Sequence, residues 1–357
     1  MNNRLDNIQG LRAIAVIAVV MFHVSTVTSE WGGSIMLKPF EYFGFAGVDL
    51  FFVISGFIMV AVHRNDLGET SYRPKFVFKR IWRIFPAYWI VWAIAALVYV
   101  DAYRFPPPCY SIDNITTPLI QSFFLLPSAY DHCFIPQAWT LNYEMYFYLT
   151  FAIVAFLPRR MLKNVFIAWC VLSIAVTLVG PKHAGAIYRF SAINLYFLSG
   201  CGLALIPRES LEKAWVYLGL FGVLFWFWSA REVAHEHFNP GHIGTRFLHF
   251  GIASVLIVAA AVGAEGRLRV PEFVIRLGDA SYAIYLLHMV VMIPFRAAVR
   301  GPAESYLSIP AFAALFVFLS IYSGLAFNTY IERPLLRLQR YLLPKQPAAG
   351  EAQQAER

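Results

Sequence analysis

Charged residues are scarce in this sequence: lysine, arginine, aspartate and glutamate make up 14% of its 357 residues, whereas hydrophobic residues make up 59%. Together with a mean hydropathy of +0.58, this balance excludes an ordinary soluble domain. Internal repeats and low-complexity blocks are also missing. The missing repeat disfavours a secondary transporter, whose two halves usually correspond in sequence. The composition therefore indicates an integral membrane protein without a separate soluble domain.

Apolar runs long enough to cross a hydrocarbon core of about 30 Å recur along the whole chain. We predict ten transmembrane helices, near residues 10–29, 42–62, 84–100, 138–157, 161–180, 189–206, 212–230, 246–264, 279–299 and 308–330. The predicted fold class is thus all-α, a polytopic membrane helix bundle. The polar segment MNNRLDNIQG precedes the first run and no small-residue cleavage site follows that run, so we expect no cleavable signal.

The basic residues predict the orientation of the bundle. Most of the 29 lysines and arginines fall on connectors of one side, above all in the segment 64–83 and after Glu332. The positive-inside rule therefore puts both termini in the cytoplasm. The same bias accounts for the net charge of +8, so we infer no nucleic-acid partner. The main segments outside the membrane are a cytoplasmic connector, 63–83, and an outward loop, 101–137, and the polar tail 344–357 is expected to be disordered.

Cysteine is scarce as well, with four residues. Cys170 and Cys201 lie within predicted spans and are expected to pack as small apolar residues. Cys109 and Cys133 share the outward loop, where they either form a disulfide or stay free, because separation in sequence does not establish disulfide geometry. The segment HEHFNPGH, residues 235–242, matches no ordered zinc pattern, so we predict no metal site.

Four titratable residues stand inside the predicted spans: His23, Asp49, Glu144 and His288. Counted from the nearest cytoplasmic basic residue, they lie at depths of about 16, 22, 22 and 18 Å. Such residues usually face a cavity or one another, which makes each a candidate for function. The alternative is a structural role, because a single buried polar side chain often only joins two helices. Their matching depth near the bilayer midplane favours the functional interpretation.

His23 is the strongest of these candidates. Eleven residues, close to three helical turns, separate it from Arg12, so the two share one helical face with Arg12 at the cytoplasmic mouth. Imidazole has an unperturbed pKa of about 6.5, and a nearby carboxylate from Asp49 or Glu144 can orient it as a proton acceptor. Such a pair can deprotonate a hydroxyl group for acyl transfer. It can equally relay protons in a proton-coupled exporter, so both interpretations stay open.

The segment YRPKFVFKRIWRIFPAYW, residues 72–89, mixes basic and aromatic side chains. If it is helical up to Phe85, Arg80 and Arg83 share one face, and Pro86 begins a change of geometry. Arginine forks bind phosphate and aromatic rings stack on purines, which favours an anion-binding role. The alternative is that these residues are ordinary positive-inside anchors at the membrane surface.

Six motifs then combine into a family pattern: IQGLRAIAVIAVVMFH at 8–23, GVDLFFVISGF at 47–57, KRIWRIFPAYW at 79–89, WTLNYEMYFY at 139–148, SYAIYLLH at 281–288 and ERP at 332–334. Through them, the chain resembles the acyltransferase 3 family of integral membrane enzymes, which transfer acyl groups, usually acetyl, onto carbohydrates. WTLNYEM is most similar to the branch that decorates exopolysaccharides. The resemblance implies a membrane acyltransferase domain over residues 5–343 in a bacterial inner membrane.

The resemblance also implies roles for single residues. It makes His23 the catalytic base, with Asp49 and Glu144 as further catalytic residues, and it makes Arg12, Arg80 and Arg83 ligands of acyl-coenzyme A. On this basis we expect acetyl-coenzyme A as the donor, with Lys79 as a further contact for its phosphates. The candidates for binding the acceptor or polarising the thioester carbonyl are Ser55, Trp139, Tyr282 and His288. Direct transfer and an acyl-histidine intermediate both remain open.

The implied acceptor is a carbohydrate, either a polysaccharide repeat unit or its lipid-linked precursor. We therefore expect the protein to contact membrane lipid and the machinery of polysaccharide biosynthesis. The sequence does not identify the glycan or the hydroxyl group that accepts the acyl group.

Overall fold

The computed structural model describes residues 5–29, 36–100, 116–126, 135–180, 183, 186–299 and 308–342, and all regular structure in these ranges is helical. This confirms the predicted all-α class for the described residues. The α-helices are α1 (Asp6–Ser29), α2 (Pro39–Phe43), α3 (Gly47–His63), α4 (Arg73–Val100), α5 (Thr116–Phe123), α6 (Ala138–Val154), α7 (Arg159–Val179), α9 (Ala186–Leu205), α10 (Arg208–Ala234), α11 (Ile243–Arg246), α12 (Ile252–Gly263), α13 (Glu272–Asp279), α14 (Ser281–Val299), α15 (Ile309–Phe327) and α16 (Arg333–Leu342).

Short 3₁₀ and π-helical segments join several of these helices. The 3₁₀ turns are η1 (Gly44–Ala46) and η2 (Thr70–Tyr72), and the π-helical segments are η3 (Phe247–Gly251) and η5 (Asn328–Glu332). Isolated π-helical turns within longer helices often occur at functional sites. Here η5 connects α15 to α16, and η3 connects α11 to α12.

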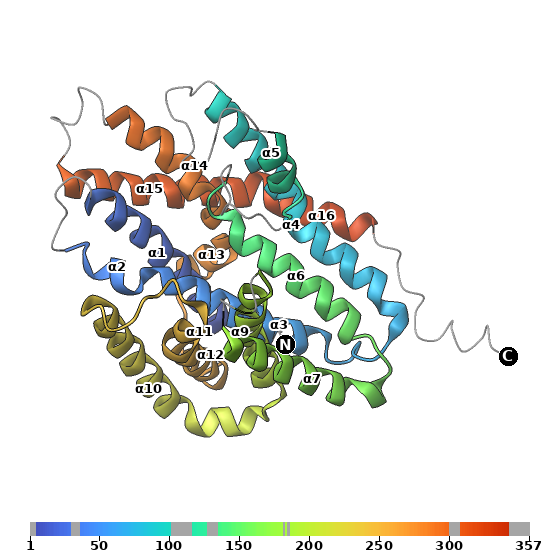
Figure 1. Cartoon of the computed structure of the whole chain (residues 1–357). Coiled ribbons are helices and arrows are strands. Elements are labelled where there is room, and N and C mark those ends of the chain that lie inside the picture. The colour runs from blue at the N-terminus through green and yellow to red at the C-terminus, as the bar shows by residue number, and fades with distance from the viewer. Residues whose placement is uncertain are drawn as a thin grey trace.

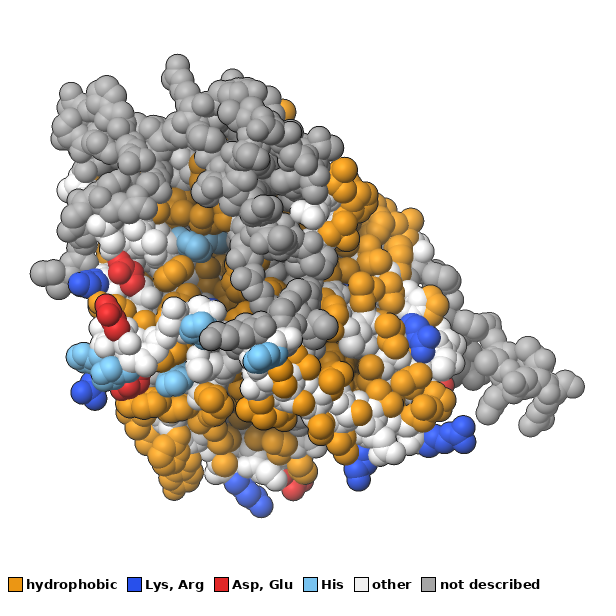
Figure 2. Space-filling model, viewed as in Figure 1, with side chains coloured by type: hydrophobic (Ala, Val, Ile, Leu, Met, Phe, Trp, Pro, Cys, Tyr) orange, Lys and Arg blue, Asp and Glu red, His pale blue; other side chains and the backbone are white. Residues whose placement is uncertain are grey.

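Seven helical segments of the described chain are long and apolar enough to cross a membrane, and the bent pair α13–α14, with 67° between its members, makes an eighth if it is one span. Each of the ten predicted spans coincides with a helix, but those at 138–157 and 189–206 correspond to α6 and α9, which are not among the seven. Ten spans are therefore confirmed only in part. Hydrophobic side chains are spread widely over the described part of the face shown in Figure 2, as expected for helices in contact with lipid.

The helices pack around α1 and α3 near the centre of the bundle (Figure 1). α1 packs against α13, α3 and α14, and α3 packs against α9. Gly56 and Gly200 allow the close approach of α3 and α9, because a Cβ atom would lie 2.0 Å from the Phe197 carbonyl oxygen at Gly56 and 2.1 Å from that of Val53 at Gly200. Glycine at these two positions lets the two backbones touch, a common solution in membrane bundles.

α4 runs without interruption from Arg73 to Val100, through Pro86. The predicted change of geometry at Pro86 is therefore wrong. Proline removes one helical hydrogen bond, but neighbouring helices can hold such a helix together in a membrane protein. Here the Tyr88 hydroxyl donates to the Ser122 carbonyl oxygen at 2.6 Å, and Trp89 Nε1 donates to that of Phe123 at 3.0 Å, which ties α4 to α5 just beyond the proline.

The C-terminal helices return to the start of α4. Trp82 Nε1 donates to the Leu335 carbonyl oxygen at 2.8 Å, and Gln339 Nε2 donates to that of Lys79 at 2.9 Å, so α16 lies against α4. This contact brings the ERP motif next to the arginines of α4. Part of the predicted outward loop is helical, as α5, while Cys109, Cys133 and the tail 344–357 lie outside the described residues.

Candidate active site

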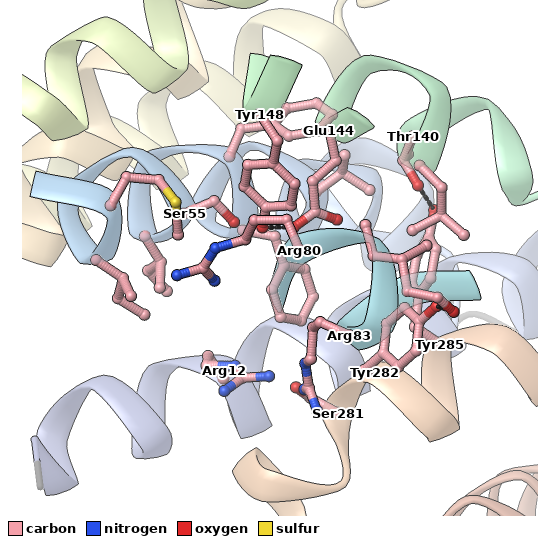
Figure 3. A pocket seen from close by; sticks show the side chains of 18 of the residues that line it. Arg12, Ser55, Arg80, Arg83, Thr140, Glu144, Tyr148, Ser281, Tyr282 and Tyr285 are labelled. Atoms are coloured by element: carbon pink, nitrogen blue, oxygen red, sulfur yellow. Dashed lines mark hydrogen bonds between the residues drawn. The ribbon is translucent and has the colours of Figure 1, made fainter. Parts of the chain in front are cut away.

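A cavity of about 370 Å³ lies between α1, α3, α4, α6 and α14. Six of the residues predicted from the sequence line it: Arg12, Ser55, Arg80, Arg83, Glu144 and Tyr282. Figure 3 shows the three arginines and Glu144 converging on the same space from α1, α4 and α6. The structure thus brings together residues that lie more than 250 positions apart in the chain, and we call this space the arginine cavity.

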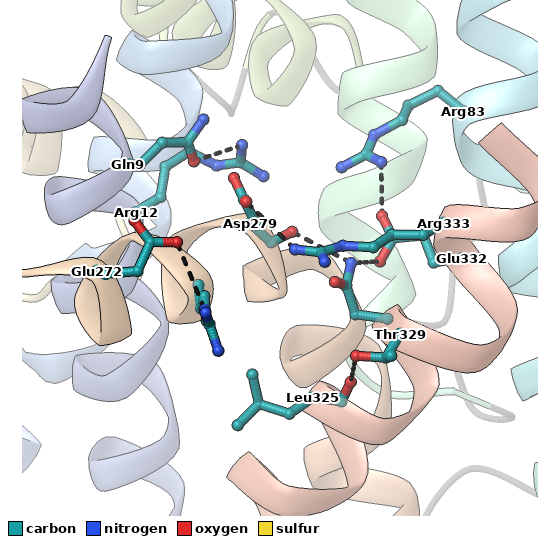
Figure 4. Close-up of polar contacts among 11 residues, drawn as sticks. Gln9, Arg12, Arg83, Glu272, Asp279, Leu325, Thr329, Glu332 and Arg333 are labelled. Carbon is teal, nitrogen blue, oxygen red and sulfur yellow. Dashed lines mark hydrogen bonds and ion pairs between the residues drawn. The ribbon is translucent and has the colours of Figure 1, made fainter. Parts of the chain in front are cut away.

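Arg80 and Arg83, one turn apart on α4, both line the arginine cavity, as their spacing predicts. Their partners differ in charge. Arg83 Nη1 lies 2.5 Å from Oε1 of Glu332, which is 1% exposed and accepts a second hydrogen bond from Asn328 Nδ2 at 2.8 Å (Figure 4). Arg80 Nη2 instead lies 2.8 Å from the imidazole Nε2 of His63. Only Arg83 therefore has its charge balanced by a carboxylate in direct contact.

Arg12 has a neutral partner as well. Its Nη1 donates to Gln9 Oε1 at 3.2 Å, one turn earlier on α1 (Figure 4). Among the described residues, no carboxylate lies within ion-pair distance of Arg12 or Arg80, and Arg80 Nε is buried without a hydrogen-bond partner. The cavity therefore holds two positive charges without a direct counter-charge, which suits an anionic ligand.

Glu144 supplies the carboxylate of the cavity. The hydroxyl of Tyr148, one turn later on α6, donates to Glu144 Oε1, and the Arg80 guanidinium carbon lies 5.4 Å from the centre of the Tyr148 ring. Within the described contacts, Glu144 forms no ion pair with any of the three arginines. It therefore keeps acceptor capacity that faces the cavity (Figure 3).

His23 and His288 form a second cluster, which we call the histidine pair. Their ring centres lie 5.1 Å apart, on α1 and α14. His288 is completely buried, and its Nδ1 lies 2.6 Å from the Tyr285 carbonyl oxygen. A carbonyl oxygen only accepts, so Nδ1 carries the proton and Nε2 keeps a lone pair. That Nε2 is buried and has no hydrogen-bond partner among the described residues.

The histidine pair does not line the arginine cavity, but Tyr285 lines the cavity and also contacts His288. Its ring lies 5.6 Å from the ring of His288, its carbonyl oxygen holds His288, and its hydroxyl accepts from Thr140 Oγ1 at 2.9 Å. Thr140 also lines the cavity. The two clusters are therefore neighbours separated by one layer of side chains.

Asp49 lies in neither cluster. Its Oδ2 accepts from Arg246 Nε at 2.9 Å and its Oδ1 lies 2.8 Å from Arg246 Nη2, which makes a two-point ion pair between α3 and α11. Both side chains are nearly buried, at 3% and 12% exposed. No described hydrogen bond or ion pair joins Asp49 or Glu144 to His23, so the structure does not place a carboxylate on that ring as the sequence suggested.

Two further predicted residues lie outside both clusters. Lys79 Nζ donates to the Tyr72 hydroxyl at 3.0 Å and does not line the cavity. Trp139 is half-buried and packs edge-to-face against Tyr143, with ring centres 5.9 Å apart. Neither contact suggests a direct role in the arginine cavity, so their predicted roles have no geometric support here.

Several residues that the sequence did not single out support the site. Tyr148 and Gln9 carry a sequence signal, because each lies one helical turn from a predicted residue. Glu332 stands in the ERP motif, which by itself does not reveal the partner of the glutamate. His63 and Arg246 have no signal of this kind, since each meets its partner on another helix, 17 positions away for His63 and 197 positions away for Arg246.

The segment 235–242 forms no metal site in the described structure. His237 Nδ1 lies 2.8 Å from Glu232 Oε2, and the rings of His235 and His237 stack with centres 5.7 Å apart. Across the part of the chain that the structure describes, no group of three or more histidine, cysteine, aspartate or glutamate side chains is arranged to hold a metal ion.

Comparison with known proteins points to one family. A family model described as "Acyltransferase domain" matches residues 5–328. The exopolysaccharide production protein ExoZ of Rhizobium meliloti (strain 1021) is 30% identical over 331 residues, which cover 87% of this chain and 95% of ExoZ. Acyltransferase MdmB of Streptomyces mycarofaciens is 24% identical, with 94% of this chain and 92% of MdmB covered.

A further relative is longer than this chain. The peptidoglycan O-acetyltransferase OatA of Listeria monocytogenes is 25% identical, and the match covers 80% of this chain but 49% of OatA. No solved structure matches the chain. None of the relatives named here is described as a transporter, so the exporter interpretation gains no support from them.

Proposed function

The chain belongs to the acyltransferase family whose model it matches over residues 5–328, and from this premise we propose that it is an acyl-coenzyme A-dependent O-acyltransferase. It moves an acetyl group from cytoplasmic acetyl-coenzyme A to a hydroxyl group of an exported polysaccharide or of its lipid-linked precursor. The observation that carries this proposal is the arginine cavity, in which Arg12 and Arg80 have no carboxylate in direct contact, with the histidine pair one layer of side chains away.

The cavity suits the phosphates of the proposed donor in charge and its acyl-pantetheine arm in size. Arg12 and Arg80 lack a carboxylate partner among the described residues, and arginine forks bind phosphate oxygens with two parallel hydrogen bonds. A volume of about 370 Å³ lies within the usual range for small-molecule sites. We assign the phosphates of the donor to the arginines and its acyl-pantetheine arm to the cavity itself. The thioester supplies the activated acyl group.

The proposed reaction needs one proton acceptor. His23 removes the proton of the acceptor hydroxyl group while the hydroxyl oxygen attacks the thioester carbonyl carbon. A new C–O ester bond forms, the C–S bond breaks, and the proton passes from the histidine to the departing thiolate of coenzyme A. In this scheme Glu144 accepts a hydrogen bond from the substrates in the cavity, and Ser55 and Tyr282 bind the reacting groups.

The two clusters suggest two directions of entry. About three turns of α1, or about 16 Å, separate Arg12 from His23. With both termini in the cytoplasm of a bacterial cell, the arginines lie toward the cytoplasmic side of the inner membrane and the histidine pair lies deeper. We therefore propose that the donor enters past the arginines and that the carbohydrate reaches His23 and His288 from the other side.

The carbohydrate acceptor is supported by the relatives. ExoZ is described as an exopolysaccharide production protein, and OatA as a peptidoglycan O-acetyltransferase, so both relate to polymers of sugars. We propose an acceptor of the same class, delivered by the machinery that builds the polysaccharide.

The test measures transfer of labelled acetyl from acetyl-coenzyme A to polysaccharide by membranes that contain wild type, His23→Ala or the control His237→Ala, at matched protein levels. His237 is an exposed residue with a surface partner, so the control changes a histidine outside both clusters. We expect label with wild type and control only. Equal labelling by His23→Ala contradicts the role of His23, and no labelling by wild type with acceptor supplied contradicts acetyl-coenzyme A-dependent transfer.

A second experiment separates the two chemical routes. Purified protein is incubated with labelled acetyl-coenzyme A in the absence of acceptor. Label that becomes attached to wild type but not to His23→Ala indicates an acyl-histidine intermediate, whereas unlabelled protein that still transfers to an added acceptor indicates direct attack.

A further inference from the structure

His63 does not line the arginine cavity, yet it holds one of the arginines of that cavity. It is the last residue of α3 and is 2% exposed. Its Nε2 lies 2.8 Å from Arg80 Nη2, and its Nδ1 lies 3.4 Å from Asp66 Oδ2. The ring therefore stands between a half-buried aspartate on the connector after α3 and a guanidinium of the proposed donor site.

These two contacts determine the protonation of the ring. A guanidinium group only donates hydrogen bonds, so Nε2 must carry a lone pair to accept one from Arg80. The single proton of the ring then lies on Nδ1 and points to the carboxylate of Asp66. His63 must therefore be neutral, in one defined tautomer, for the observed arrangement to exist.

Aromatic rings complete the surroundings. The centres of the Tyr72 and Phe76 rings lie 5.7 and 5.1 Å from that of His63. The Arg80 guanidinium carbon lies 5.3 Å from the centre of Phe76 and 5.4 Å from that of Tyr148. Arg80 is thus oriented by two aromatic faces and one neutral nitrogen, which restricts its position without cancelling its charge.

Arg83, one turn away, shows the opposite arrangement. Its partner is the buried carboxylate of Glu332, at 2.5 Å, which balances its charge. Two arginines of one cavity therefore differ in the charge of the group that holds them. A carboxylate at position 63 would hold Arg80 equally well, but it would remove the attraction of that arginine for an anion.

We infer that His63 is a positioning residue, which holds the Arg80 guanidinium toward the arginine cavity with its positive charge free to bind a phosphate group of the acyl-coenzyme A donor. This inference rests on the proposed function. His63, which is neutral and lies outside the cavity, keeps Arg80 in place and leaves its positive charge available.

The inference also predicts a dependence on pH. The titratable and charged groups that face His63 are Asp66, Tyr72, Lys79 and Arg80. When the ring gains a second proton, both nitrogens become donors, the hydrogen bond from Arg80 is lost, and two positive charges face each other. Binding of the donor should therefore weaken when a fall in pH protonates the His63 ring. A variant with glutamine at position 63 should not show this effect, because its side chain does not titrate.

Three variants of the full-length protein separate position from charge. His63→Gln offers a neutral carbonyl oxygen near the place of Nε2, His63→Phe keeps an aromatic ring but has no acceptor, and His63→Glu offers a charged acceptor. The matched control is His237→Phe, which removes an exposed histidine outside the cavity. The dissociation constant of coenzyme A is measured by calorimetry for each purified protein, together with its thermal unfolding and the KM and kcat for acetyl-coenzyme A.

We expect His63→Gln and the control to bind coenzyme A as wild type does, within about twofold. His63→Phe and His63→Glu should bind at least about tenfold more weakly, because an interaction with a charged group is lost or neutralised. The loss should raise KM more than it lowers kcat. Wild type should lose affinity relative to His63→Gln only at pH values well below the ordinary imidazole pKa of about 6.5, because burial and the neighbouring Arg80 oppose a second proton on the ring.

Several results overturn the inference. Wild-type affinity in His63→Phe shows that no acceptor is needed, and wild-type affinity in His63→Glu shows that the charge of Arg80 does not matter. Affinity in His63→Gln as weak as in His63→Phe shows that the ring acts in another way. If wild type binds no coenzyme A, the proposed donor is wrong and this inference falls with it. If His63→Phe does not fold, the comparison of His63→Gln with His63→Glu still decides.

Discussion

The arginine cavity and the histidine pair share helices α1 and α14, but their side chains are stabilised in different ways. The two α4 arginines of the cavity are held by side chains from other helical segments, Arg83 by Glu332 and Arg80 by His63. His288, in contrast, is held by the carbonyl oxygen of Tyr285 on its own helix and is otherwise surrounded by a buried core. The first arrangement leaves positive charge for an anion, and the second leaves a neutral nitrogen with a free lone pair.

This difference separates two tasks that would disturb each other in one place. A histidine directly among three guanidinium groups would be strongly disfavoured in its protonated form, which it must adopt briefly to move a proton. Tyr285 and Thr140 stand between the two clusters and join α14 to α6 by the hydrogen bond of their hydroxyl groups. We therefore expect that the binding charge and the proton acceptor can be changed independently of each other.

The largest effect is expected at the histidine pair. His23→Gln should lower kcat for acetyl transfer by about 10²–10⁴-fold, the usual contribution of a general base. The dissociation constant of coenzyme A should not change, because the arginine cavity does not include this residue. Transfer kinetics and calorimetry on the same preparation check both halves of the prediction. A parallel loss of coenzyme A binding would show that the two clusters are not independent.

The next largest effect concerns the Asp49–Arg246 pair. Arg246→Met leaves the nearly buried carboxylate without its partner and should lower the free energy of unfolding by about 3–5 kcal/mol. Unfolding of the purified protein in detergent measures this loss. The double variant Asp49→Leu, Arg246→Met removes both charges and should recover most of the stability.

The double variant also decides the role of Asp49. If it is stable and transfers acetyl at the wild-type rate, Asp49 is structural, and the catalytic role that its motif suggests is wrong. If it is stable and inactive, the carboxylate takes part in the reaction. Either result shows whether the proposed reaction at the histidine pair needs the carboxylate of Asp49.

A smaller effect distinguishes the two arginines of α4. Arg80→Gln should weaken coenzyme A binding about tenfold or more, since this arginine has no carboxylate partner and is free to bind phosphate. Arg83→Gln should weaken binding less but lower stability more, because it leaves the buried Glu332 without its ion pair. Calorimetry and thermal unfolding of both variants give the comparison. Equal effects of the two variants on binding would contradict the division of roles.

The smallest effect is expected at Lys79. It contacts the Tyr72 hydroxyl and does not line the cavity, so Lys79→Ala should change the dissociation constant of coenzyme A by less than about threefold, the scale of an exposed ionic contact. A tenfold loss in a folded protein would show that the donor extends beyond the cavity to the surface of α4. It would also restore the role that the sequence suggested for this lysine.

Much of the site was predictable because its signals are local. The spacing of Arg80 and Arg83 predicts one shared face, and both residues do line one cavity. Arg12, Glu144 and Tyr282 were also predicted, from their motifs or from a charge inside an apolar run. The local signals do not reveal the contacts of Asp49 and Lys79, whose side chains the packing directs to Arg246 and Tyr72, and the roles predicted for these two residues stay predictions.

The sequence by itself determined where the helices lie and which titratable side chains they carry into the membrane, because hydropathy and helical period are properties of neighbouring residues. Only the tertiary structure decided which of those side chains meet. Arg83 finds Glu332 at a separation of 249 residues, and Arg246 finds Asp49 at a separation of 197. The continuous α4 at Pro86 depends in the same way on its contacts with α5. Ion pairing and helix continuity depend on which helices become neighbours, and no local pattern contains that information.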